Sequence, residues 1–139
     1  MDQRISFITL VVEDVETSRR FYVDGLRWEP ELHVAGEVLM LRMGERLILS
    51  LWDRMAAEHE IGPVAAGGTP PVTLAHNLAD EAGVDRVVAE ARAAGAEIVA
   101  EPQKREWGGY SGYFADPDGY RWEIAFNPGP IGESVLPQP

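Results

Sequence analysis

Residues 107–128, WGGYSGYFADPDGYRWEIAFNP, predict two short strands joined by a tight turn. The turn is residues 116–119. Pro117 fixes φ at the second position, Asp116 can accept hydrogen bonds from nearby backbone N–H groups, and Gly119 tolerates positive φ. The aromatic and β-prone residues on either side of this turn favour a hairpin.

The second strand of the hairpin, residues 120–126, alternates between two kinds of side chain. One face carries the large apolar residues Tyr120, Trp122, Ile124 and Phe126, and the other carries Arg121, Glu123 and Ala125. Successive side chains of a strand point to opposite faces, and the apolar face of a sheet must be buried. We therefore expect Glu123 to point away from the helices that cover the sheet.

Length and composition indicate one ordinary globular domain. The chain has 139 residues, of which 45% are hydrophobic and 25% charged, within the usual range for such a domain. No stretch approaches the roughly 18 apolar residues of a membrane span, and no signal segment opens the chain. The absence of cysteine excludes disulfides and thiol chemistry and is compatible with the cytoplasmic location that we expect.

The formal net charge is −11, because 23 acidic residues outnumber 12 basic ones. Nucleic-acid binding needs basic patches, so no nucleic-acid partner is expected. An acidic surface can attract a cationic ligand, and it can also serve solubility alone.

The first half of the chain predicts one strand, one helix and three further strands. Asp14 suits the N-cap of the helix, and Gly25 suits the position just after its end. The expected elements are a strand at 5–12, a helix at 14–24, an extended segment at 28–34, and strands at 37–43 and 46–52.

The second half repeats this order after a linker, 54–71, in which we expect at most a helical turn. A strand at 72–78, a helix at 83–94 that ends at Gly95, an extended segment at 96–100 and a polar loop precede the hairpin. The chain therefore divides into module one (about 4–53), the linker, module two (about 72–128) and a Pro-rich tail (129–139). A repeat of this kind predicts two similar units with a shared architecture.

The sequence resembles the vicinal-oxygen-chelate superfamily, which includes glyoxalase I, bleomycin-resistance proteins and extradiol dioxygenases. The resemblance rests on the D-P-D-G turn followed by an aromatic residue and Glu123, and on the opening VED, SRRFY and GL segments of residues 12–26. It implies an α+β fold of one domain, residues 1–139. Two βαβββ modules would form a cupped, incomplete mixed β-barrel around a cavity, and a homodimer is expected.

The resemblance also implies where a metal would bind. Metal-dependent members place ligands on the first and last strands of each module, and the first-strand ligand stands seven residues before the Asp that opens the helix. Those positions are Phe7 and Thr73 here, and residues 46–52 contain no carboxylate or imidazole. Glu123 alone remains, so no metal or other cofactor is expected. A divalent metal held by an unusual ligand set is the alternative.

Glu123 is the candidate catalytic or ligand-binding group of this cavity. It could bind a cationic or hydrogen-bonding ligand, act as a base, or form a structural ion pair with Arg121. The residues expected to contact the ligand are Phe7, Thr9, Thr73, Asn77, Trp107, Tyr113 and Glu123.

Two further residues have competing interpretations. Trp107 precedes two glycines and could stack on a planar or cationic ligand, or pack within the protein. His76 shares the parity of Leu74, which favours a structural role on the helix side of the sheet. A β-bulge would instead turn His76 towards the ligand.

Three functions are compatible with the sequence. The chain is expected to bind a small molecule without the usual metal site, similarly to bleomycin-resistance proteins. One alternative is a metal-dependent lyase or dioxygenase of the glyoxalase I type with an unusual ligand set. The other is a metal-free lyase or isomerase that uses Glu123 as its base.

Overall fold

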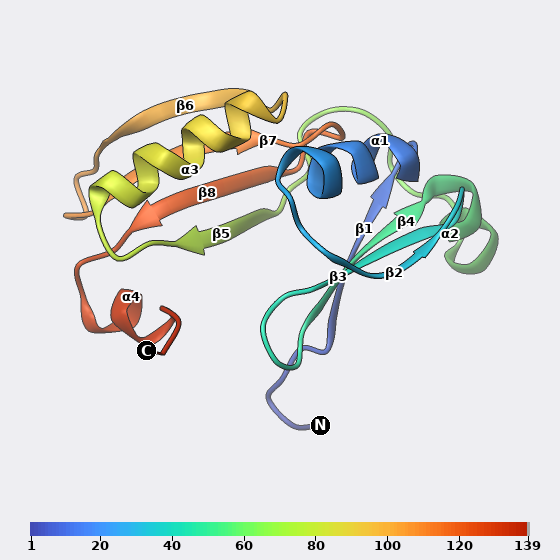
Figure 1. The fold of residues 1–139 in the computed structure, drawn as a ribbon. Coiled ribbons are helices and arrows are strands. Elements are labelled where there is room, and N and C mark those ends of the chain that lie inside the picture. The colour runs from blue at the N-terminus through green and yellow to red at the C-terminus, as the bar shows by residue number, and fades with distance from the viewer. Residues whose placement is uncertain (139) are drawn as a thin grey trace. The chain divides into compact units, whose positions relative to one another are not determined.

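The computed structural model describes residues 1–138, and the chain divides into two compact units, Met1–Gly67 and Gly68–Pro139. Each unit contains one four-stranded mixed sheet with helices beside it (Figure 1). The predicted α+β class and the two βαβββ modules are therefore confirmed.

The elements follow the predicted order in both units. The first unit contains β1 (Phe7–Val12), α1 (Val15–Arg19), the π-helix η1 (Arg20–Gly25), β2 (Pro30–Val34), β3 (Val38–Arg42), β4 (Ile48–Asp53) and α2 (Arg54–Ile61). The second contains β5 (Thr73–Asn77), α3 (Glu81–Ala93), β6 (Glu97–Lys104), β7 (Tyr110–Ala115), β8 (Arg121–Phe126) and α4 (Pro130–Ser134).

The two sheets have equivalent strand orders, β1-β4-β3-β2 and β5-β8-β7-β6. In each sheet the first strand pairs in parallel with the last strand of the module, and the other pairs are antiparallel. This agreement in both order and direction shows that the modules repeat one topology.

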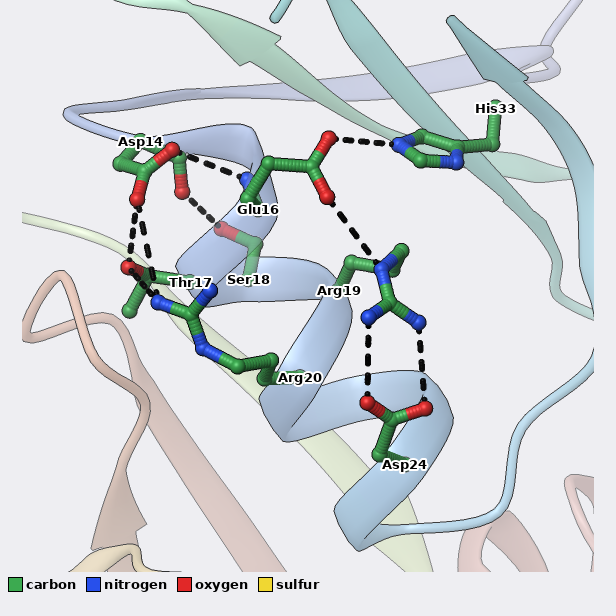
Figure 2. Close-up of polar contacts among 8 residues, drawn as sticks. All are labelled: Asp14, Glu16, Thr17, Ser18, Arg19, Arg20, Asp24 and His33. Carbon is green, nitrogen blue, oxygen red and sulfur yellow. Dashed lines mark hydrogen bonds and ion pairs between the residues drawn. The ribbon is translucent and has the colours of Figure 1, made fainter. Parts of the chain in front are cut away.

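Both major helices begin at an aspartate that caps free backbone N–H groups. Asp14 accepts from the Glu16 N–H at 3.0 Å and from the Thr17 hydroxyl at 2.7 Å (Figure 2). Asp80 accepts from the Gly83 N–H at 2.7 Å. These contacts satisfy N–H groups that have no partner within the helix, which fixes where each helix starts.

The two helices end differently, although glycine was expected to stop both. Gly95 has φ +96°; its N–H donates to the Arg92 carbonyl at 3.0 Å, as a left-handed C-terminal turn requires. Gly25 is instead the last residue of η1, Leu26 caps it, and the left-handed residue is Arg27, with φ +64°. The prediction that Gly25 stands just after the helix end is therefore wrong, because the π-helical segment extends one residue further and the chain turns at Arg27.

The structure also corrects the linker. Residues 54–61 form the two-turn helix α2 instead of at most one turn. Asp53 makes this possible because its side chain accepts from the Met55 N–H at 2.9 Å and from the Ala56 N–H at 3.4 Å. The sequence pattern missed this helix because its composition has no clear apolar period.

Strand β6 is longer than predicted and includes four residues of the expected polar loop. It is an edge strand of its sheet, where a polar run and a proline are tolerated. Gly112 on β7 leaves room for Pro102, since a Cβ at Gly112 would lie 3.0 Å from the Pro102 ring. The register between β6 and β7 shifts on both sides of Ala100.

The predicted turn at residues 116–119 is confirmed in detail. The Gly119 N–H donates to the Asp116 carbonyl at 3.0 Å, and Gly119 has φ +83°. The N–H groups of Asp118 and Tyr120 both donate to Asp116 Oδ1 at 2.9 Å. Asp116 is buried, so these bonds compensate for the water that its carboxylate loses.

Helix α3 covers one face of β6, β7 and β8 (Figure 1). On the sheet, Trp122 and Ile124 are 4% and 1% exposed, and the Phe114 and Trp122 rings stack with centroids 6.2 Å apart. On the helix, Val84, Val88 and Ala91 are buried. The apolar parity predicted for β8 is therefore the one that packs under the helix.

The part of the chain that the structure describes has no helix of the length and apolar character needed to cross a membrane.

Ile124→Ala tests the packing of α3 on the second sheet. Removing a fully buried branched side chain leaves a cavity, so the free energy of unfolding should fall by about 2–5 kcal/mol in a urea titration. Gln103→Ala, at an exposed position of the same sheet, is the control and should change it by less than about 0.5 kcal/mol. Equal effects of the two substitutions would contradict this assignment of the core.

Candidate functional site

The face of the second sheet opposite α3, here called the distal face, gathers the polar side chains of the hairpin. Strand register places the residues of one parity on this face. They are Thr73, Ala75 and Asn77 of β5, Arg121, Glu123 and Ala125 of β8, and Ser111, Tyr113 and Ala115 of β7. Glu123 therefore lies opposite Trp122 and Ile124, as the alternation predicted.

Tyr113 and Glu123 form the central contact of the distal face. They are direct neighbours in the antiparallel register of β7 and β8, and the Tyr113 hydroxyl donates to Glu123 Oε1 at 2.7 Å. Both side chains are half-buried. Within residues 1–138, Glu123 Oε2 makes no hydrogen bond, so one carboxylate oxygen is available to a ligand.

Arg105 extends this contact from the loop between β6 and β7. Its Nε donates to the Ser111 hydroxyl and its Nη2 to the Ser111 carbonyl, both at 2.9 Å. Its guanidinium carbon lies 5.5 Å from the centroid of the Tyr113 ring, a cation–π distance. No pattern in the sequence indicates Arg105, because a loop residue follows no periodic pattern.

Arg121 lies on the other side of the central pair, beside Ala115 in the register. Its Nη2 contacts the Thr69 hydroxyl at 3.4 Å, and its Nε is buried with no hydrogen-bond partner in the described chain. The ion pair between Glu123 and Arg121 that the sequence allowed is not formed within residues 1–138. Glu123 is paired with a neutral hydroxyl instead.

The environment raises the pKa of the Tyr113 hydroxyl above its ordinary value of 10.0. Burial is the largest cause, followed by the hydrogen bond to the Glu123 carboxylate and its negative charge, while Arg105 acts in the opposite direction. Tyr113 therefore remains a protonated donor at neutral pH, which holds the Glu123 carboxylate in one orientation.

The other expected contact residues are divided between the two sheets. Thr73 and Asn77 lie on the distal face, beside Arg121 and Ala125 respectively. Phe7 and Thr9 belong to β1 of the first sheet, where they lie beside Ile48 and Ser50 of β4.

Trp107 lies in the loop between β6 and β7 and is 53% exposed. Its indole lies over Gly109, where an added Cβ would be 1.8 Å from the ring. Gly109 therefore makes room for the neighbouring tryptophan, which is one of the two roles that the sequence allowed for Trp107.

Few donor atoms stand at the positions where the resemblance places metal ligands. The register places Ser50 of the first module where Glu123 stands in the second, because each lies two residues beyond the partner of Phe7 or Thr73. The four positions are therefore occupied by the carboxylate of Glu123, the hydroxyls of Ser50 and Thr73, and Phe7, which has no donor atom. Asp53, the carboxylate of β4, caps α2. Residues 1–138 contain no group of three or more His, Asp or Glu side chains that could hold a metal ion.

His76 lies beside Ile124, on the α3 side of the sheet. Its surface is exposed, yet the surrounding atoms displace enough water to lower the pKa of the imidazole below 6.5. The predicted parity is therefore observed, and no β-bulge turns His76 to the distal face.

His33 Nε2 donates a hydrogen bond to Glu16 Oε1 at 2.9 Å (Figure 2). Arg19 bridges Glu16 at 3.3 Å and Asp24 at 3.1 Å. These groups satisfy one another and tie β2 to α1 and η1. We therefore interpret this second polar cluster as structural.

Comparison with known proteins identifies the family. The family model described as Glyoxalase/Bleomycin resistance protein/Dioxygenase superfamily matches residues 4–124. A search of curated proteins gives no match.

Solved structures agree with this family. A glyoxalase-related enzyme from Fulvimarina pelagi is 34% identical, with a TM-score of 0.82 over 91% of this chain and 89% of that one. A glyoxalase/bleomycin resistance protein/dioxygenase from Nocardioides is 27% identical, with a TM-score of 0.76 over 93% and 89%. A lactoylglutathione lyase from Agrobacterium tumefaciens, 22% identical with a TM-score of 0.71 over 91% and 96%, shares the fold. The chain belongs to the Glyoxalase/Bleomycin resistance protein/Dioxygenase superfamily.

Proposed function

We propose that the distal face binds a small organic molecule, and that Glu123 holds it without a metal ion. The observation that carries this proposal is the Tyr113–Glu123 hydrogen bond of 2.7 Å, which leaves Oε2 of a half-buried carboxylate without a partner in residues 1–138. A group that donates a hydrogen bond or carries positive charge would bind there through a charge-assisted hydrogen bond.

Tyr113 prepares the carboxylate for such a ligand. Its hydroxyl fixes Oε1, so binding does not need to order the Glu123 side chain. Arg105 in turn holds the Tyr113 ring from one side and is itself fixed by two bonds to Ser111. A chain of supporting contacts of this kind favours a site that is formed before the ligand arrives.

The remaining expected contacts are proposals of the same kind. We propose that Thr73, Asn77 and Trp107 contact the ligand together with Tyr113 and Glu123, while Phe7 and Thr9 of the first sheet stay predictions from the sequence. We also propose that the protein acts in the cytoplasm as a homodimer, as the resemblance implies; light scattering of the purified protein measures the assembly directly.

A second candidate is a metal-free lyase or isomerase in which Glu123 Oε2 removes a proton from the bound molecule. The free oxygen favours it, since a general base must reach the proton that it removes. The relative from Fulvimarina pelagi is described as an enzyme, which supports a catalytic role. Turnover that is lost in Glu123→Gln while binding is kept would favour this candidate.

Glu123→Gln tests the binding role. The substitution keeps the shape of the side chain and removes its charge. A cationic ligand found by screening small amines should therefore lose roughly 1–3 kcal/mol of binding free energy in calorimetric titration. Glu97→Gln removes the same charge from an exposed position of β6 and is the matched control. Equal affinities in wild type and Glu123→Gln would reduce Glu123 to a structural residue.

The ionisation of Tyr113 tests the hydrogen bond itself. In Glu123→Gln the pKa of Tyr113 should fall towards 10.0, because the carboxylate that helps to raise it is gone. Absorbance near 295 nm follows the tyrosines against pH, and Tyr113→Phe in both backgrounds identifies the component that moves. Because the pKa of Tyr113 is raised in the folded state, the protonated hydroxyl contributes to the free energy of unfolding below pH 10. That contribution is lost as the pH rises through the pKa that Tyr113 has in the folded protein. An unchanged tyrosine curve would contradict the contact.

Metal content tests the ligand set. After dialysis against Zn²⁺, Ni²⁺ or Mn²⁺ and then against buffer, elemental analysis should find far less than one metal ion per chain. The reason is that the family positions supply one carboxylate and two hydroxyls here. About one tightly bound ion per chain that disappears in Glu123→Ala would show that the ligands lie elsewhere and would favour the metal-dependent alternative.

A further inference from the structure

Within residues 1–138, the two arginines at the distal face, Arg105 and Arg121, have no counter-ion. Acidic residues outnumber basic ones by 23 to 12, so a basic side chain has ample opportunity to find a carboxylate. The arginines that form ion pairs are Arg4, Arg19, Arg20, Arg42, Arg54, Arg86 and Arg92. Within residues 1–138, Arg105 and Arg121 form none.

Burial distinguishes these two arginines from the other basic groups without an ion pair. In the described chain, Arg27, Arg46 and Lys104 also have no carboxylate within 4.0 Å, but they are exposed and water solvates them. Arg105 and Arg121 are half-buried. A guanidinium that gives up part of its water without gaining an anion loses free energy, so this arrangement is unusual in an acidic protein.

The two arginines flank the candidate site. Along β7, the register gives three successive rows on the distal face: Ser111 with Ala125, Tyr113 with Glu123, and Ala115 with Arg121. Arg105 is bonded to Ser111 in the first row and lies over the Tyr113 ring, while Arg121 belongs to the third. The row on one side of Glu123 therefore contains Arg121, and the row on the other side is bonded to Arg105.

Both arginines also retain unused hydrogen-bond donors. Within the described residues, Arg105 uses Nε and Nη2 on Ser111, and its Nη1 has no partner. Arg121 Nε is buried and has no partner either. The planar, forked donors of guanidinium match the oxygens of carboxylate and phosphate, so an oxyanion would satisfy the free Nη1 of Arg105 and compensate the charge of both arginines.

We propose that the ligand of the distal face carries an oxyanion, a carboxylate or a phosphate group, which Arg105 binds with added charge from Arg121. This inference rests on the proposed function and narrows it. The ligand is then amphoteric, with a hydrogen-bond donor or cationic group at Glu123 and an anionic group next to Arg105. A purely cationic molecule would leave both arginines unsatisfied.

Titrations followed by amide NMR of the full chain test the proposal. Sodium phosphate and sodium succinate are the two anionic probes, with ionic strength held constant by sodium chloride, and methylammonium is the cationic probe. At least one of the two anions should change the amide chemical shifts of Ser111 and Tyr113, and these changes should saturate as the anion concentration rises. The preference identifies whether the natural group is a phosphate or a carboxylate.

The variants separate a specific site from general charge. Arg105→Gln should weaken anion binding at least tenfold, and Arg121→Gln should weaken it less. Arg46→Gln removes the same charge from an exposed site and should leave binding unchanged. Arg105→Lys keeps the charge and loses the fork, so its affinity should fall between wild type and Arg105→Gln. Methylammonium binding should survive in Arg105→Gln, which shows that the site remains folded.

The outcomes distinguish this inference from the function on which it rests. Linear shifts with both anions, or equal dissociation constants for Arg105→Gln and Arg46→Gln, would overturn the oxyanion site. If methylammonium then still binds in a Glu123-dependent manner, the proposed function stands alone. If the anions bind through Arg105 and methylammonium does not bind, the oxyanion site stands and the role given to Glu123 fails.

Discussion

The burial of Trp122 and Ile124 under α3 is the constraint on which the candidate site depends. These two side chains cannot leave the helix side of the sheet without exposing a large apolar area, worth about 1.5–3 kcal/mol for each side chain. Since neighbouring residues of a strand point in opposite directions, Glu123 is held on the distal face by the packing of residues that it never contacts. A shift of one residue in β8 would exchange the two faces entirely.

The strand register determines which charged and polar side chains lie near Glu123 on the distal face. Glu123 accepts a hydrogen bond from the Tyr113 hydroxyl; Arg121 occupies the row on one side, and Arg105 is bonded to Ser111 of the row on the other side. In the described chain Glu123 thereby forms no ion pair, and Arg105 and Arg121 have no carboxylate within 4.0 Å. Opposite charges that are held near one another but unpaired can each serve a different group of a ligand.

The repeated topology makes the difference between the modules informative. Ser50 and Met40 occupy in the first sheet the positions that Glu123 and Tyr113 occupy in the second. The same strand order therefore carries a hydrogen-bonded tyrosine and glutamate in one module and a serine beside a methionine in the other. The scaffold is shared, and the chemistry resides in a few side chains of the second module, as expected when one fold supports many functions.

The sequence alone determined the two βαβββ modules, the turn at residues 116–119 and the direction of Glu123. Each depends on local signals: apolar alternation, an aspartate cap, and turn residues with restricted φ. The sequence could not predict the π-helix η1, the helix α2 or the length of β6, because hydrogen bonding and edge position decided them against weak local patterns. It also could not identify Arg105 or pair Tyr113 with Glu123. Those contacts depend on the register between strands and on a loop that folds back over one of them, and only the tertiary structure fixes such distances.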